Sequence, residues 1–279
     1  MPLTNHNLFA ALRDQFPADL DSTAIETADG GPPRYYTWRD LDRGTARIAN
    51  LLKWLELPAG ARIAVQTEKS VEALMLYLAV LRAGLVYLPL NTAYQTSEIE
   101  YFIGNAEPSV VVCSVKNFGW ISKLAFKAGT QHVFTLNDDR SGSLLQRAAS
   151  HADEHTPAQR SADDLAAILY TSGTTGRSKG AMLSHGNLLS NARTLKDYWG
   201  WQRGDVLLHA LPIFHVHGLF VASHGALLNG SKMLWFGKFS ARAVVERLPE
   251  VSVFMGVPTM YVRLLAEAGF TPQACRTMR

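Results

Sequence analysis

The segment Tyr170–Gly180 combines the residue types that bind phosphate groups. It reads Tyr-Thr-Ser-Gly-Thr-Thr-Gly-Arg-Ser-Lys-Gly and directly follows an apolar run. Glycines accept positive φ angles and let the backbone approach an anion closely, so successive N–H groups can form a concave nest around phosphate oxygens. The hydroxyls of Ser172, Thr174 and Thr175 add donors, and Lys179 adds a charged donor. The segment therefore predicts a phosphate-binding loop.

Two other interpretations fit this segment less well. A Gly- and Ser-rich hairpin between two strands is the simplest, but a turn alone does not require so many hydroxyls beside glycine and lysine. The P-loop of nucleoside triphosphatases requires Gly, four residues, then Gly-Lys followed by Ser or Thr. Here Lys179 stands three residues after Gly176 and precedes Gly180. The spacing therefore disfavours a P-loop hydrolase.

A second group of candidate residues lies around His215. His215 and His217 could suggest a metal pair, with His209 and His224 nearby in the sequence. No cluster of Cys, Asp or Glu completes such a site, so the pattern disfavours zinc. An imidazole can instead donate a hydrogen bond to a carboxylate, and a histidine packed in the core is the structural alternative.

Alternating strands and helices must position these candidates. We expect strands over Ala61–Thr67, Leu85–Leu88, Ser109–Ser114, His132–Leu136, Leu165–Tyr170, Ala181–Ser184, Asp205–Leu211, Lys232–Phe236 and Ser252–Val257. We expect helices after the caps Thr37 and Thr96, and over Ser70–Ala83, Asn117–Ala128, Gly186–Tyr198, Phe214–Leu228, Ala241–Leu248 and Pro258–Ala268. Continuous apolar strands between helices indicate an α/β fold with mostly parallel sheets covered by helices.

The polar segment Ser150–Asp163 contains Pro157 and shows no periodicity, so we expect a surface connection there. It divides the chain into two α/β halves, residues 1–160 and 161–279. The second half contains the predicted phosphate loop and His215.

Composition excludes several classes of protein. The chain has 279 residues with 27 basic and 24 acidic side chains, a net charge of +3, which disfavours a nucleic-acid binder. Its two cysteines, Cys113 and Cys275, disfavour a disulfide scaffold and fit a reducing compartment, most simply the cytoplasm. The apolar stretch Leu74–Leu90 contains Arg82, Gly84 and Pro89. It is therefore expected to form a buried helix and strand, with no membrane partner.

Three motifs together resemble those of the acyl-adenylate-forming (AMP-binding) superfamily. They are Tyr170–Gly180, Leu211–Gly218 and Met255–Thr259. Within that superfamily the similarity is closest to the malonate–CoA ligases, and the segments that carry it are Gln66–Ser70, Leu88–Tyr94, Asp163–Asn187 and His209–Ala222. Enzymes of this kind join ATP and a carboxylate into an acyl-AMP with release of pyrophosphate, and then transfer the acyl group to CoA.

The resemblance assigns roles to individual residues. It implies that the ATP phosphates are contacted by Thr171, Ser172, Gly173, Thr174, Thr175, Gly176 and Lys179. It makes His215 the histidine between the acyl and nucleotide pockets, and places Gly256, Val257 and Pro258 along the acyl pocket. A malonate substrate has a second carboxylate that needs a cationic partner when buried. Arg263 is the candidate for that partner, with a surface arginine on an amphipathic helix as its alternative.

The resemblance covers only about the first half of such a ligase. It implies malonate, with methylmalonate as a second acid, together with ATP, CoA and Mg²⁺, and it places the magnesium ligand and the mobile C-terminal domain outside this chain. We therefore expect little or no ligase activity from the chain alone. Two alternatives stay open: a ligase for another short carboxylic acid, and a noncatalytic truncated nucleotide-binding product. The sequence leaves the oligomeric state undetermined.

Overall fold

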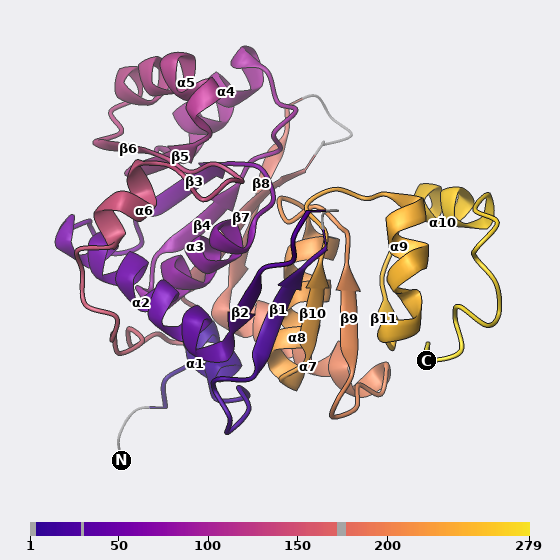
Figure 1. Cartoon of the computed structure of the whole chain (residues 1–279). Coiled ribbons are helices and arrows are strands. Elements are labelled where there is room, and N and C mark those ends of the chain that lie inside the picture. The colour runs from indigo at the N-terminus through magenta and orange to yellow at the C-terminus, as the bar shows by residue number, and fades with distance from the viewer. Residues whose placement is uncertain (1–3, 29–30, 172–176) are drawn as a thin grey trace. The chain divides into compact units, whose positions relative to one another are not determined.

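The computed structural model describes residues 4–28, 31–171 and 177–279. Contacts within the chain define two compact units, one of residues 1–11 and 42–190 and the other of residues 12–41 and 191–279. Each unit is built on a sheet flanked by helices (Figure 1). The α/β fold class expected from the sequence is confirmed, because both sheets are mostly parallel.

The sheet of the first unit has the strand order β6-β5-β3-β4-β7-β8. Its strands are β3 (Arg62–Gln66), β4 (Val86–Pro89), β5 (Val110–Cys113), β6 (His132–Thr135), β7 (Leu165–Thr171) and β8 (Lys179–Ser184). All neighbouring pairs are parallel except β7 and β8, which form an antiparallel hairpin at one edge. The inner strands are short apolar runs, and β4 and β5 are buried along their whole length.

Helices bury the faces of this sheet. Every residue of α3 (Val71–Arg82) is buried, the Ser70 hydroxyl accepts from the Ala73 N–H at its start, and Gly84 follows its end with φ +70°. Apolar residues of α4 (Thr96–Ala106) and α5 (Val115–Lys127) form one core cluster with residues of β3, β4 and β5. A short helix, α6 (Ser143–Ala148), follows β6.

The sheet of the second unit has the order β11-β9-β10-β1-β2. Its strands are β1 (Thr23–Thr27), β2 (Tyr35–Thr37), β9 (Val206–His209), β10 (Lys232–Trp235) and β11 (Val253–Phe254). Only the β1–β2 pair is antiparallel. The helical segments of this unit are a π-helix over His217–Ser223, α8 (His224–Asn229), α9 (Ala241–Arg247), a 3₁₀ turn over Leu248–Glu250 and α10 (Pro258–Leu265). The chain passes between the units within α1 (Leu8–Arg13), α2 (Trp38–Trp54) and α7 (His185–Tyr198).

The two units differ from the halves expected at residues 160 and 161. Residues 161–190 belong to the first unit because β7 pairs with β4, and residues 12–41 belong to the second because β1 pairs with β10. Polar composition marks where a chain lies at the surface, whereas strand pairing decides which segments share a core. The structure also contains β1, β2, α1 and α6, which the sequence patterns did not predict.

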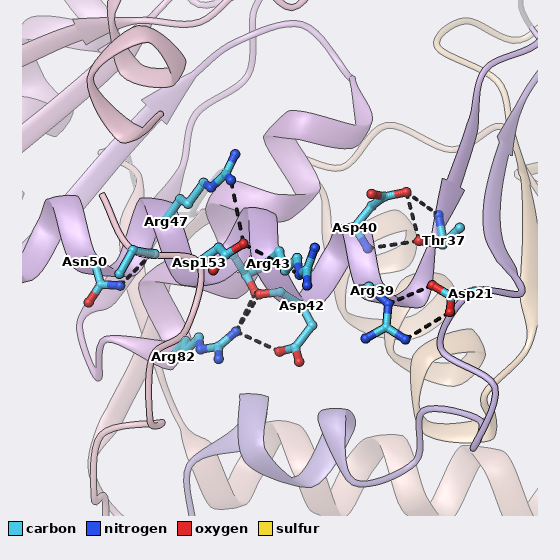
Figure 2. A network of polar contacts seen from close by, with 12 residues as sticks. Asp21, Thr37, Arg39, Asp40, Asp42, Arg43, Arg47, Asn50, Arg82 and Asp153 are labelled. Carbon is cyan, nitrogen blue, oxygen red and sulfur yellow. Dashed lines mark hydrogen bonds and ion pairs between the residues drawn. The ribbon is translucent and has the colours of Figure 1, made fainter. Parts of the chain in front are cut away.

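The two helix starts expected from threonine caps have different outcomes. The cap expected at Thr37 is confirmed by two reciprocal hydrogen bonds between Thr37 and Asp40. The Thr37 N–H donates to Asp40 Oδ2 over 2.8 Å, and the Asp40 N–H donates to Thr37 Oγ1 over 3.0 Å (Figure 2). The cap at Thr96 was wrong, because Thr96 is the first residue of α4 and Gln95 precedes it as the cap. The Gln95 N–H donates to Glu98 Oε2 over 2.9 Å, so Glu98 stabilises the start of α4, with the cap one residue earlier than expected.

The polar segment Ser150–Asp163, expected as a surface connection, is held by hydrogen bonds to its backbone, and we call it the strap. Arg82, at the end of α3, donates from Nε to the His155 carbonyl over 2.9 Å and from Nη1 to Asp42 Oδ1 over 2.9 Å. The Asn50 amide donates to the carbonyls of Ala152 (2.8 Å) and Glu154 (2.9 Å). Figure 2 shows Arg82, Asp42 and Asn50, together with Asp153, which pairs with Arg43 and Arg47 of α2. Side chains from α2 and α3 thus fix the strap backbone.

Among the helices of the described residues, none combines the length and the apolar character needed to cross a membrane.

Candidate functional site

The predicted phosphate loop begins and ends on the β7–β8 hairpin of the first unit. Thr171, the last residue of β7, is the cross-strand partner of Lys179, the first residue of β8. Thr171 Oγ1 lies 3.5 Å from the Lys179 carbonyl oxygen, and both residues are exposed. The remaining loop positions, Ser172, Gly173, Thr174, Thr175 and Gly176, lie outside the described residues. The structure therefore brings together the two ends of the loop.

Gly180, which follows Lys179, lies in a part of the hairpin with little room for a side chain. It pairs with Tyr170 across the hairpin, and a Cβ placed on it would come within 2.9 Å of Ile168 Cγ2 and 3.5 Å of the Tyr170 ring. A larger residue would force Ile168 or the strand to shift. Glycine at this position therefore lets the strand that carries Lys179 pack closely on its partner.

His215 lies in the second unit, between the end of β9 and the π-helix. It is exposed, and its carbonyl accepts from the Leu219 N–H over 3.0 Å. His217 is partly buried, and desolvation lowers the pKa of its imidazole, with a smaller contribution from the nearby His215. The exposed imidazole of His215 is thus available to a ligand, and its neighbour His217 favours the neutral form.

A buried hydrogen-bonded group holds this segment against β9. His209 Nε2 lies 2.9 Å from the Gly218 carbonyl oxygen and 3.0 Å from Ser223 Oγ, and the Ser223 hydroxyl donates to the same carbonyl over 2.9 Å. The His209 ring packs 4.6 Å from the Trp235 ring, centroid to centroid. Gly218 and Ser223 both belong to the π-helix, a rare helix type that is frequent at functional sites.

The close fold-back also requires glycine at position 218. A Cβ there would lie 2.1 Å from the Pro212 carbonyl oxygen, which is far inside contact distance. His224, one turn beyond, is fully buried beside Phe220, and burial lowers the pKa of its imidazole to about 3. The described residues contain no group of three or more His, Cys, Asp or Glu side chains placed to hold a metal ion. His209 and His224 instead have roles in packing and hydrogen bonding.

The acyl-pocket candidates follow the neighbouring strand, β11. Gly256 comes two residues after β11, Val257 is the cap of α10, and Pro258 is its first residue, as the sequence predicted. Strands β9 and β11 are parallel neighbours, so the segments that carry His215 and Gly256 leave the sheet at the same end, the carboxyl end of the strands. In α/β folds ligands bind at the carboxyl ends of the strands. In the second unit, His215 and Gly256–Pro258 therefore follow the carboxyl ends of two neighbouring strands.

Arg263 has a different environment from these residues. It is exposed on α10, and its guanidinium carbon lies 5.0 Å from the centroid of the Phe239 ring. This is the contact expected of a surface arginine that stacks on an aromatic residue. Its assignment to a distal carboxylate stays a prediction. Sequence reasoning missed the His209–Ser223 pair, for which the only available signal was a histidine at the end of an apolar strand.

Comparison with known proteins places this geometry in a family. The family model described as AMP-binding enzyme matches residues 12–278, which is nearly the whole chain. The chain belongs to the AMP-binding enzyme family. The assignment agrees with the sheet architecture, because the structure of apo MatB from Rhodopseudomonas palustris superposes with a TM-score of 0.93 at 50% identity, covering 99% of this chain and 54% of MatB. The ATP-bound structure of MatB gives the same values.

Relatives identified by sequence include malonate–CoA ligases. The mitochondrial malonate–CoA ligase of Bos taurus is 30% identical over 248 residues, covering 82% of this chain and 40% of the relative. The malonate–CoA ligase of Arabidopsis thaliana is 31% identical over 219 residues, covering 74% and 36% respectively. The chain thus spans about half the length of the relatives it matches, or less.

Proposed function

We propose that the chain provides phosphate- and acyl-binding parts of an ATP-dependent, AMP-forming acid–CoA ligase whose acid is malonate, with methylmalonate as a second acid. The observation that carries the proposal is the pairing of Thr171 with Lys179 at the two ends of a glycine- and hydroxyl-rich loop. Similarity to MatB and to the malonate–CoA ligases of cattle and Arabidopsis supports the choice of acid.

The proposed reaction has two steps. A carboxylate oxygen of the acid attacks the α-phosphorus of ATP, the bond to the bridging oxygen breaks, and pyrophosphate leaves. The sulfur of CoA then attacks the acyl carbon of the adenylate, a carbon–sulfur bond forms and the acyl carbon–oxygen bond to AMP breaks, so that AMP leaves and the thiol proton is released. Negative charge grows on the pyrophosphate during the first step, so donors already aimed at it accelerate the reaction.

In this scheme the loop Thr171–Lys179 binds the departing phosphates, and the Lys179 ammonium supplies the positive charge. His215 donates a hydrogen bond to the reacting carboxylate from its exposed position after β9. Gly256, Val257 and Pro258 form part of the acyl-pocket wall. Thr171 is the last residue of β7, and His215 and Gly256–Pro258 lie in the segments that follow β9 and β11, which is consistent with these roles.

Magnesium is proposed to accompany ATP, with its protein ligand outside this chain. Around Thr171 and Lys179 the described donors are hydroxyl and carbonyl oxygens, without the carboxylates that Mg²⁺ sites usually include. The described residues therefore do not make a magnesium site, and we derive no step through the ion. For the compartment we propose the cytoplasm, since Cys113 and Cys275 are free thiols.

A second candidate is a ligase for another short carboxylic acid. Arg263 stacks on Phe239 and lies exposed, so the described acyl segment has no buried cation dedicated to a second carboxylate. This observation favours an acid with one carboxylate, unless the cation comes from elsewhere in the protein.

The experiment that tests the proposal is a binding measurement with this chain. Isothermal titration calorimetry should detect ATP binding, weakened at least tenfold in Lys179→Ala and unchanged in Lys123→Ala, an exposed lysine of α5. With ATP present, malonate should bind more tightly than succinate or acetate. Equal ATP affinity in the wild type and Lys179→Ala would contradict the loop assignment, and tighter binding of acetate would favour the second candidate.

The expected inactivity of the chain alone has its own test. Mass spectrometry after incubation with ATP, Mg²⁺, malonate and CoA should find neither malonyl-CoA nor AMP. Their joint appearance, absent from Lys179→Ala, would establish the reaction and contradict the expected inactivity.

A further inference from the structure

One face of α4 contacts the hairpin that carries the phosphate loop. Tyr101 and Asn105 are four residues apart on α4 and therefore lie on the same face of the helix. The Tyr101 hydroxyl donates to the Ser178 carbonyl over 2.7 Å. The Tyr170 hydroxyl donates to Asn105 Oδ1 over 2.5 Å. A single helical face thus holds one residue from each side of the hairpin.

Both contacts fall next to residues proposed to bind phosphate. Ser178 directly precedes Lys179, so the Tyr101 hydrogen bond fixes the peptide group from which Lys179 extends. Tyr170 directly precedes Thr171 at the end of β7. The two bonds therefore fix the chain two residues before and two residues after the segment 172–176.

Strand β8 needs such support because it is the edge strand of the sheet and Lys179–Met182 are exposed. Ring contacts strengthen the attachment: the Phe102 and Tyr170 centroids lie 4.5 Å apart, and Tyr101 meets Tyr170 edge-on at 6.2 Å. The Arg177 guanidinium carbon lies 5.7 Å from the Tyr101 ring centroid. These ring contacts do not depend on the Tyr101 hydroxyl, so its hydrogen bond can be removed without removing the packing.

We infer that Tyr101 is a positioning residue for phosphate binding, whose hydroxyl holds the Ser178 carbonyl so that the Lys179 ammonium is placed for the phosphates, with Asn105 fixing the opposite strand through Tyr170. The inference rests on the proposed function of the loop. Its physical basis is preorganisation: a lysine whose backbone is already fixed loses less conformational freedom when it binds an anion.

The test uses pyrophosphate as the probe and the variants Tyr101→Phe, Lys179→Ala and the double variant. The affinity of the chain for pyrophosphate is measured by calorimetry, and the melting temperature is recorded for each variant. Tyr101→Phe should weaken binding about three- to tenfold, the range for one hydrogen bond. Its melting temperature should stay close to that of the wild type. Tyr198→Phe, at a side chain that is 84% exposed, is the matched control.

The double variant separates positioning from general support. If Tyr101 acts through Lys179, its substitution should weaken binding in the wild type and have little further effect in Lys179→Ala. Additive losses, or wild-type affinity in Tyr101→Phe while Lys179→Ala is weakened, would overturn the inference and leave the proposed function standing. Unchanged affinity in Lys179→Ala would overturn both. If Tyr101→Phe does not fold, Asn105→Leu provides the second variant, with a loss expected in the wild type and little further loss in Lys179→Ala.

Discussion

The hairpin of the first unit and the His215 segment of the second hold their candidate residues in different ways. Thr171 and Lys179 lie exposed at a sheet edge, and hydroxyl and amide side chains of α4 fix the hairpin from outside. The segment after β9 is held from beneath by buried His209 and Ser223. Substitutions at the hairpin should therefore change ligand binding with little loss of stability, whereas substitutions under the His215 segment should reduce stability first.

The largest effect is expected for His209→Ala. The substitution removes the ring that packs on Trp235 and the contacts of Nε2 with Gly218 and Ser223. The second unit should lose about 3 kcal/mol of unfolding free energy, from the cavity and the lost hydrogen bonds together. Urea denaturation measures the loss. A change below about 0.5 kcal/mol would show that the network contributes little and would remove the contrast between the two regions.

Lys179→Ala should weaken ligand binding and leave stability almost unchanged. Removing the ammonium should weaken ATP binding by about 1.5–3 kcal/mol, or roughly ten- to a hundredfold, because charge-assisted hydrogen bonds to phosphate are lost. Stability should change by less than about 0.5 kcal/mol, since the side chain is exposed. Calorimetry and thermal melting measure the two quantities. A large loss of stability with intact binding would reverse the contrast.

Acid should act on the second unit through His224. Burial lowers the pKa of this imidazole to about 3 from an ordinary value of 6.5. The folded state therefore keeps it neutral, while the unfolded state takes up a proton below about pH 6.5. The free energy of unfolding therefore does not depend on this histidine above pH 6.5. As the pH drops from 6.5 toward 3, it decreases by about 1.4 kcal/mol per pH unit.

His224→Gln provides the matching variant, because glutamine does not titrate. Its unfolding free energy between pH 6 and pH 4 should have a shallower slope than that of the wild type. His6→Gln, at an exposed position, should keep the wild-type slope. Identical slopes in His224→Gln and the wild type would mean that other groups account for the acid sensitivity.

Arg263→Ala should have only a small effect on stability. Its contact with Phe239 is exposed, so its loss should cost at most about 0.5–1 kcal/mol. Malonate affinity in the presence of ATP decides its role. Unchanged affinity would leave Arg263 as a surface residue, whereas a tenfold loss for malonate without a loss for acetate would assign it to the second carboxylate.

The sequence predicted those features that depend on local chemistry. The strand before the loop, the buried helix ended by Gly84 and the proline at the start of α10 all follow from composition over a few residues. Short β1 and β2 could not be found in this way, because they are strands through their pairing with β10 and with each other. Strand pairing joins residues far apart in the chain, and a local pattern contains no information on which partner a strand takes.

The candidate residues show the same limit. Phosphate-binding residue types were visible in the sequence as a dense cluster, and so was His215. The contacts of Tyr101, Asn105 and His209 were not visible, because each residue acts on a segment that only folding brings near. For the same reason the role of Arg263 depends on what it faces, which its position on an amphipathic helix cannot decide.

The strap between α6 and β7 has a consequence for how the protein can be cut. By composition, Ser150–Asp163 looks like a surface connection between two halves of the chain, the kind of segment that a protease cleaves. Proteases need a segment that can leave its contacts and fit extended into their clefts, and Arg82 and Asn50 restrain this backbone through its carbonyl groups. Cleavage at residue 160 would also separate β7 from β4 and β1 from β10, so neither piece would contain a complete sheet. A cut at the place that looks easiest to divide would therefore leave each sheet with strands from both pieces.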